Sequence, residues 1–131
     1  MTILLDTSVI IDALRGRRGR RELLRGLLEQ GHELACCAIS VAEVYSGMRP
    51  DEVEATAELM DALEYVDISR EAAREAGQLR QEWQRKGRTF SLPDAIIGAV
   101  ALRGDLSLVT DNVRHFSMLH LKLQPLPEAS V

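Results

Sequence analysis

Four acidic residues stand where predicted strands give way to predicted helices, and as a group they suit metal binding. They are Asp6, Glu43, Asp94 and Asp111. In a parallel sheet, residues at such junctions share the edge formed by the carboxyl ends of the strands. Carboxylates brought together there repel one another unless a cation neutralises them. Because all four donors are oxygen ligands, the expected ion is Mg²⁺ or Mn²⁺ rather than Zn²⁺.

Carboxylates around a hydrated Mg²⁺ suit phosphoryl chemistry. The ion lowers the pKa of its bound water, orients that water and stabilises charge on the leaving oxygen. We therefore predict a metal-dependent phosphodiesterase. The sequence contains no G-x-S-x-G motif, no P-loop and no G-x-G-x-x-G motif, which disfavours a serine nucleophile and nucleotide binding by those routes.

Each acid taken singly also has a purely structural explanation. Ser40 and Glu43 match the S-x-x-E capping box, which satisfies the first amides of a helix. Asp6 and Asp111 are suitable helix N-caps, and the positive end of a helix dipole would stabilise Asp94. The predicted metal site therefore depends on the shared sheet edge and not on any one acid.

The elements that must position these acids are short strands alternating with helices. Apolar runs at 2–5, 34–39, 107–110 and possibly 119–123 predict buried parallel strands. Helical patterns, several of them opened by Ser, Asp or Pro and closed by Gly, cover 8–14, 20–30, 41–46, 51–63, 69–86 and 93–102. This alternation predicts an α/β sandwich, with helices covering a parallel sheet.

Length and composition predict one cytoplasmic domain over residues 1–131. No apolar run approaches the ~18–20 residues that span a bilayer. Asp6 interrupts the N-terminal apolar run too early for a signal peptide. The adjacent Cys36 and Cys37 are poorly placed to join distant segments, and we expect reduced thiols in the core.

Charge is unevenly distributed along the chain. A net charge of −4 and a pI of about 5.4 argue against a general polyanion-binding protein. However, 14 of the 16 basic residues are Arg, and six of these lie between Arg15 and Arg25. Arg15, Arg17, Arg18, Arg20 and Arg21 are expected on an exposed turn. There they can bind phosphates, pair with an acidic partner or merely aid solubility.

Four motifs occur in a fixed order along the chain: LLDTS at 4–8, ISVAEVYSG at 39–47, PDAIIGA at 93–99 and VTDNVRHF at 109–116. Together they resemble PIN-domain proteins, and specifically the VapC toxins of type II toxin–antitoxin systems. The resemblance covers essentially the whole chain. It implies a PIN-like three-layer sandwich with a central parallel sheet of four to five short strands flanked by helices. It also implies a Mg²⁺- or Mn²⁺-dependent endoribonuclease that cuts RNA.

The resemblance further implies a small cognate antitoxin that blocks the groove near the acids, and a homodimer or an antitoxin-bound hetero-oligomer. It places the first three catalytic and metal-binding acids at Asp6, Glu43 and Asp94. The fourth often stands two places after the conserved Thr of the motif, where this chain has Asn112, whereas Asp111 stands one place after. The expected substrate-binding residues are Thr7, Ser8, Thr110, Asn112, Arg17, Arg18, Arg88 and Arg114.

Four alternatives stay open. A haloacid-dehalogenase-like phosphatase would need a second acid two places after Asp6, where this chain has Ser8. A catalytically silent PIN-like binding module would act through protein contacts alone. Thr7 and Ser8 serve either as hydrogen-bond donors to water or phosphate or simply as helix caps. The apolar residues at 95–102 and the leucines at 23, 24, 27 and 28 belong either to the core or to a partner surface.

Overall fold

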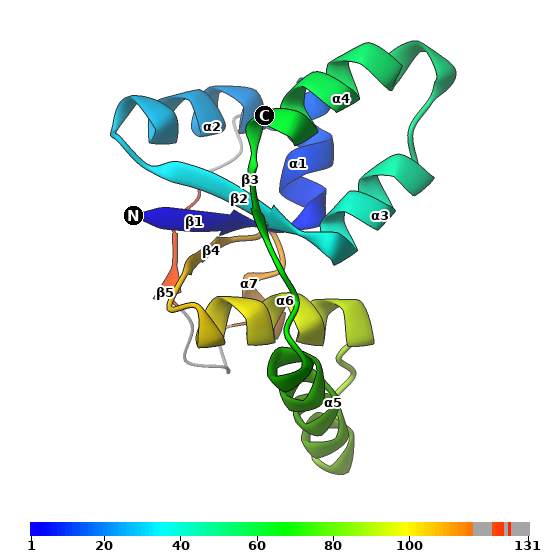
Figure 1. Cartoon of the computed structure of the whole chain (residues 1–131). Helices are drawn as coiled ribbons and strands as arrows, with labels where there is room; N and C mark the ends of the chain where they lie inside the picture. Colours follow the sequence, from blue (N-terminus) through cyan, green and yellow to red (C-terminus); the bar gives the residue numbers. More distant parts are fainter. Residues whose placement is uncertain (117–121, 125, 127–131) are drawn as a thin grey trace.

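A five-stranded parallel sheet organises the chain. The computed structural model describes residues 1–116, 122–124 and 126 (Figure 1). The strands lie in the order β3-β2-β1-β4-β5, and every neighbouring pair is parallel. They comprise β1 (Thr2–Leu5), β2 (Glu33–Cys37), β3 (Glu64–Val66), β4 (Ser107–Val109) and β5 (Lys122–Leu123).

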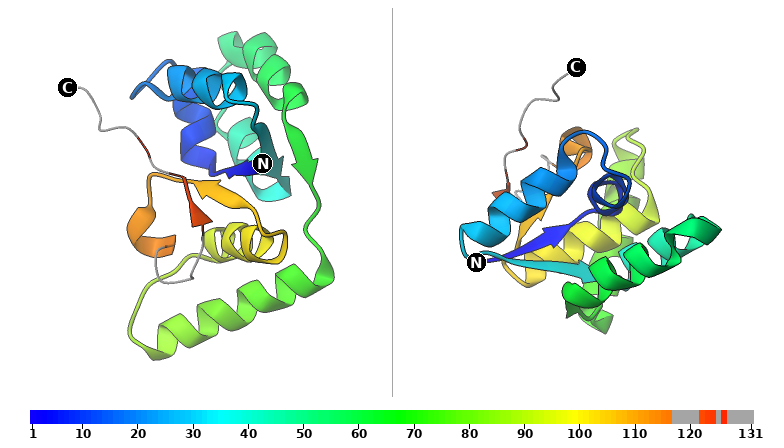
Figure 2. Two further views of the ribbon diagram at one scale, coloured as in Figure 1. Left: turned by 90° about the vertical axis from the view of Figure 1, so that its left-hand side faces the viewer. Right: turned by 90° about the horizontal axis from the view of Figure 1, so that it is seen from above.

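Helices cover both faces of this sheet. They are α1 (Thr7–Leu14), α2 (Arg20–Glu29), α3 (Ala38–Ser46), α4 (Val53–Ala62), α5 (Arg70–Arg85), α6 (Leu92–Arg103) and the short α7 (Val113–Phe116). The first four lie on one face, whereas α5 and α6 lie on the other (Figures 1 and 2). This arrangement confirms the predicted α/β three-layer sandwich with five strands.

The central strand β1 is buried on both of its faces. Ile3 and Leu5 pack with the core under α1, α2, α3 and α4, while Leu4 points into the core under α5 and α6. Successive side chains of a strand point to opposite faces, so a strand covered on both sides reads as a continuous apolar run. The run at 2–5 has this property, which is why it was predicted correctly.

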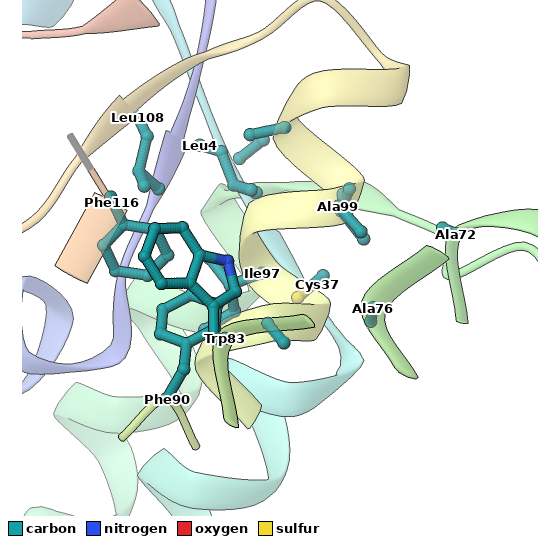
Figure 3. Close-up of a cluster of buried hydrophobic side chains, with 14 residues drawn as sticks. Leu4, Cys37, Ala72, Ala76, Trp83, Phe90, Ile97, Ala99, Leu108 and Phe116 are labelled. Carbon is teal, nitrogen blue, oxygen red and sulfur yellow. The ribbon is translucent and has the colours of Figure 1, made fainter. Parts of the chain in front are cut away.

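Three aromatic rings anchor α5 to the sheet. Trp83 of α5 lies 6.1 Å from Phe90, measured between ring centroids, and Phe90 lies 5.9 Å from Phe116 (Figure 3). The rings pack with Leu4 and Leu108 of the two central strands. Aromatic pairs at these separations add to the stabilisation that comes from buried area alone.

Several boundaries differ from those predicted. β2 ends at Cys37 and α3 begins at Ala38. The predicted boundaries differ because an apolar run does not show where a strand passes into a buried helix. The 3₁₀ turn η1 (Pro50–Glu52) precedes α4 and shortens the helix predicted at 51–63. β3 and α7 were not predicted. Of the possible strand at 119–123, residues 119–121 lie outside the described residues.

None of the described helices combines the length and the hydropathy needed to cross a membrane.

Candidate active site

Asp6 lies at the centre of the carboxyl edge of the sheet. It follows β1 and forms the N-cap of α1. Its Oδ1 accepts a hydrogen bond from the Thr7 amide over 2.8 Å, and its Oδ2 accepts one from the Thr110 hydroxyl over 2.7 Å. The Asp6 amide donates to the Val109 carbonyl over 2.9 Å. These bonds fix the carboxylate, which is only 4% exposed, between the ends of β1 and β4.

The pKa of Asp6 is raised above its ordinary value. Burial is the main cause, and the negative charges of Asp94 and Glu43 add to it. The hydrogen bonds from Thr110 and Thr7 act in the opposite direction because they stabilise the ionised carboxylate. Asp94 and Glu43 are therefore close enough to Asp6 to act on its charge at this edge of the sheet.

Glu43 is connected to this edge through Thr7. The Thr7 Oγ1 lies 2.7 Å from Oε1 of Glu43 and 3.0 Å from the Ser40 hydroxyl. A carboxylate only accepts hydrogen bonds, so Thr7 donates its proton to Glu43. The N-cap of α3 is Cys37, with no side-chain cap bond, so the explanation of Ser40 and Glu43 as a capping box is wrong.

Asp94 stands in the first turn of α6, with its carboxylate 21% exposed. Its amide donates to the Ser91 hydroxyl, which caps the helix, over 3.2 Å. The Nδ1 atom of His115 lies 3.6 Å from Oδ2 of Asp94. His115 was not among the predicted site residues, although its position inside the last motif is a signal that could have identified it.

Asp111 has different partners from the other three acids. Its Oδ1 lies 2.6 Å from Nη2 of Arg20. Its Oδ2 lies 3.4 Å from the Ser8 hydroxyl and 3.5 Å from Nη1 of Arg18. The neighbouring Asn112 is exposed, and its amide donates to the Thr110 hydroxyl over 2.9 Å. The structure thus places Asp111 in a cationic environment beside the acid group.

The arginines predicted on one exposed turn have separate roles. Arg15 forms an ion pair with Glu52 over 3.1 Å, and Arg21 donates to the carbonyls at the end of α1. Arg20 is buried, so its predicted exposure is wrong. The cause is the ion pair with Asp111, a residue that is distant in sequence. Arg17 and Arg18 are exposed, as predicted.

The last two predicted substrate-binding arginines lie on other elements. The guanidinium of Arg88 lies over the Trp83 ring, 5.7 Å from its centroid, just after α5. Arg114 is exposed on α7, directly before His115. The expected phosphate-binding arginines therefore lie on separate elements and do not form one cluster.

The acid group fits a hydrated Mg²⁺ or Mn²⁺ by donor chemistry. In the part of the chain that the structure describes, no three Asp, Glu, His or Cys side chains are close enough to hold an ion as they stand. Mg²⁺ keeps several waters and is usually bound through one or two carboxylates, so it does not require a complete protein cage. Cys36 and Cys37 are buried free thiols whose pKa is raised by burial, which makes them inert core residues.

Comparison of the chain with known proteins identifies its family. The family model for the PIN domain matches residues 3–119. The chain belongs to the PIN-domain family. This confirms the family resemblance that the four sequence motifs indicated.

Relatives of this PIN domain are named as VapC ribonucleases. Ribonuclease VapC19 of Mycobacterium tuberculosis is 33% identical over 122 residues, which cover 93% of this chain and 97% of the relative. Ribonuclease VapC10 of the same organism is 34% identical over 123 residues, covering 94% of this chain and 91% of the relative. The matches therefore extend over nearly the full length of both partners.

Solved structures with the same fold include toxin–antitoxin complexes. A toxin–antitoxin complex from Klebsiella pneumoniae gives a TM-score of 0.73 at 30% identity, covering 88% of this PIN domain and 90% of that chain. VapBC2 from Rickettsia felis, bound to a DNA fragment, gives a TM-score of 0.77 at 24% identity, with coverage of 95% and 98%. The second match supports the fold alone.

Proposed function

We propose that this PIN domain is a Mg²⁺- or Mn²⁺-dependent endoribonuclease and the toxin of a type II toxin–antitoxin pair. The observation that carries the proposal is the buried Asp6, held by Thr7 and Thr110 and facing the charges of Asp94 and Glu43. Mutual repulsion of this kind is relieved by a divalent cation. The names of the relatives, which are ribonucleases, support RNA as the substrate.

Asp6, Glu43 and Asp94 would hold the metal ion, and each is oriented by a different contact. A divalent ion bound by these acids would act as a Lewis acid that activates water and neutralises charge on the leaving oxygen. Asp6 is the fixed ligand, because both of its oxygens are already oriented by hydrogen bonds. Glu43 is oriented by the Thr7 hydroxyl, and Asp94 is oriented by the first turn of α6. Pre-oriented ligands reduce the reorganisation needed during the reaction.

The RNA backbone binds around this group. Arg17 and Arg18 are exposed on the turn after α1, and Arg18 lies within 3.5 Å of Asp111 at the edge of the site. Arginine side chains bind phosphate by paired hydrogen bonds, and such contacts fix the register of a nucleic acid without reading its sequence. The further expected contacts are Thr7, Ser8, Thr110, Asn112, Arg88 and Arg114.

An apolar groove between α2 and α4 suits the antitoxin. It has a volume of about 600 Å³. It is lined by Ala13 and Leu14 at the end of α1, whereas Asp6 caps the start of that helix, so it is a different place from the groove near the acids that the resemblance implies. Leu28 on its border is 56% exposed, and Arg25 and Glu58 add charge around the apolar surface. An amphipathic helix fits a groove of this composition with its apolar face inward. The lining residues are Ala13, Leu14, Arg21, Leu24, Arg25, Leu28, Ala55, Glu58 and Leu59. A homodimer is also proposed, from the family resemblance.

The deciding experiment measures RNA cleavage by the purified protein with Mn²⁺ and with EDTA. We expect cleavage only with the metal, and Asp6→Asn should reduce the rate by about 10³-fold or more. Asp61→Asn, at an exposed position in the last turn of α4, which leads into the amino end of β3, is the matched control and should retain full activity. Metal-independent cleavage would contradict the proposal, and so would an active Asp6→Asn protein. No cleavage of any RNA would favour the silent module, whereas hydrolysis of a small phosphate ester alone would favour the phosphatase.

A further inference from the structure

Arg20, at the start of α2, is a charged side chain that the proposed chemistry does not use. Only 2% of it is exposed. Its Nη2 lies 2.6 Å from Oδ1 of Asp111, and its Nη1 donates to the Arg18 carbonyl over 3.1 Å. Its Nε has no hydrogen-bond partner among the described residues. Buried ion pairs of this kind add little net stability compared with apolar side chains of similar volume, so stability alone does not explain Arg20.

Asp111 is held from several sides by residues of the segment that follows Asp6 in the chain. Arg20 and Arg18 come from the start of α2 and the turn before it, and Ser8 comes from the first turn of α1. Two of these three partners are cationic. A carboxylate with these partners is already neutralised and does not need a metal ion for that purpose.

The ion pair is connected to Asp6 through the backbone. Asp111 directly follows Thr110, whose hydroxyl donates to Oδ2 of Asp6 over 2.7 Å. The same hydroxyl accepts a hydrogen bond from the Asn112 amide over 2.9 Å. When Arg20 holds the side chain of Asp111, it also fixes the backbone that aims Thr110 at Asp6.

The turn that precedes Arg20 depends on it as well. Gly16, Arg18 and Gly19 have φ angles of +63°, +57° and +68°, in the left-handed region. That region is unfavourable for Arg18 because it has a Cβ atom. The hydrogen bond from Arg20 to the Arg18 carbonyl holds the turn in this conformation. One guanidinium therefore fixes both the turn that presents Arg18 and the strand end that supports Asp6.

We propose that Arg20 is a positioning residue for the reaction, and that Asp111 acts through this ion pair rather than as a ligand of the metal. The ligands are then Asp6, Glu43 and Asp94. This inference rests on the proposed function, and it differs from the sequence-based expectation that Asp111 or Asn112 is the fourth ligand.

A double-mutant cycle tests the proposal by kinetics. Arg20→Met and Asp111→Asn should each lower kcat by about tenfold, with little change in KM for RNA. The double variant should be no slower than the slower single variant, because both changes remove the same interaction. Arg20→Lys, which keeps a cation beside Asp111, should recover part of the loss. Arg74→Met on α5 is the control and should not change kcat. An effect of about a hundredfold in the double variant would overturn the proposal.

Mn²⁺ binding to the RNA-free protein, followed by electron paramagnetic resonance of free Mn²⁺, separates the two roles of an acid. Asp94→Asn should raise the Kd for Mn²⁺ by at least about tenfold, whereas Asp111→Asn should leave it within about twofold. A comparable loss of affinity in both variants would make Asp111 a metal ligand and overturn the proposal.

Amide hydrogen exchange in the metal-free protein provides a readout that does not depend on activity. Arg20→Met should accelerate exchange of the Asn112 amide by about tenfold, and Arg74→Met should leave it unchanged. Should Arg20→Met fail to fold, Asp111→Asn, which preserves the side-chain shape, replaces it. Unchanged exchange would overturn the positioning role. An absence of RNA cleavage by the wild-type protein would instead overturn the proposed function, and the exchange result would still decide whether Arg20 positions the strand end.

Discussion

The hydroxyl of Thr110 donates to Oδ2 of Asp6 over 2.7 Å, although the two residues are 104 positions apart in the sequence. This bond joins the ends of the two central strands, β1 and β4, at the edge where the acids gather. Thr110 also accepts a hydrogen bond from the Asn112 amide. A single hydroxyl thus connects the first acid of the site to the backbone of the last motif.

Removal of this hydroxyl should affect both stability and activity. Thr110→Val leaves Oδ2 of the buried Asp6 and the Asn112 amide without their partner, which should cost about 1–3 kcal/mol in the free energy of unfolding. We expect kcat to fall by about 10–100-fold. Thr110→Ser retains the hydroxyl and should stay close to wild type in urea unfolding and in RNA cleavage. Wild-type stability and activity in Thr110→Val, or a loss in Thr110→Ser as large as that in Thr110→Val, would contradict the role given to the hydroxyl.

The ionisation of Asp6 should destabilise the metal-free protein. Its pKa is raised above the ordinary value of 3.8, chiefly by burial, so the folded state favours the protonated form. The contribution of Asp6 to stability should therefore be fully present below its ordinary pKa of 3.8 and should be lost as the pH rises through the raised pKa. Asp6→Asn removes this penalty, so in EDTA its Tm should exceed that of wild type at pH 7.5. The difference should shrink toward pH 4. A lower Tm for Asp6→Asn at pH 7.5 would contradict this explanation.

Binding of a divalent metal ion should offset the loss of stability that the ionised Asp6 causes. An ion that binds only the folded state stabilises it by about 2.7 kcal/mol at a concentration a hundred times its Kd. The Tm measured by thermal unfolding should therefore rise when Mn²⁺ or Mg²⁺ is added, and it should not rise in buffer that contains EDTA. Asp94→Asn should lose most of this rise, and Asp61→Asn, exposed in the last turn of α4, should keep it. A shift of the same size in both variants would indicate nonspecific ion binding.

Leu28 should contribute to antitoxin binding. A charge at this exposed border of the α2–α4 groove would have to be covered by the apolar face of the partner helix, so Leu28→Glu should weaken binding by about a hundredfold. RNA cleavage by the protein alone should remain unchanged. Tyr65→Glu, at an exposed site on β3, is the control. Calorimetric titration with the cognate antitoxin measures both, and unchanged affinity for Leu28→Glu would place the antitoxin elsewhere.

Trp83 should contribute strongly to the stability of the layer that α5 and α6 form. Trp83→Ala removes a ring that packs on Phe90 and is only 9% exposed, which should cost about 3–5 kcal/mol. Tyr65→Ala, at a half-exposed edge position, should cost about 1 kcal/mol or less. Urea unfolding of the two variants compares them directly. Similar costs would mean that the aromatic cluster is not the anchor of α5.

The features that the sequence predicted well are those carried by local patterns. The buried runs at 2–5 and 107–110 became β1 and β4, and the Ser69 cap correctly marked the start of α5. The edge strand β3 was missed, because two of its three residues, Glu64 and Tyr65, are exposed and give no apolar run. Edge strands need only one covered face, so their sequences carry a weaker signal.

Only part of the candidate site can be predicted from local sequence patterns. Asp6, Glu43 and Asp94 follow from local motifs at the ends of strands and the starts of helices. The pairing of Arg20 with Asp111 depends on a contact between residues 91 positions apart, and no periodicity reports such a contact. An Arg within a basic segment is usually exposed, so the burial of Arg20 reverses the expectation drawn from its neighbours.

The strand order has a consequence for the synthesis of the protein. Among the described strands β1 leaves the ribosome first, whereas its neighbour β4, which supplies the backbone bond to Asp6 and precedes Thr110, follows only after β2 and β3. A nascent chain that lacks residues 107–110 can therefore contain Asp6, Glu43 and Asp94 without the support that orients the first of them. The topology therefore delays the final orientation of Asp6 until β4 has been translated, and under the proposed function it would delay RNA cleavage to the same point.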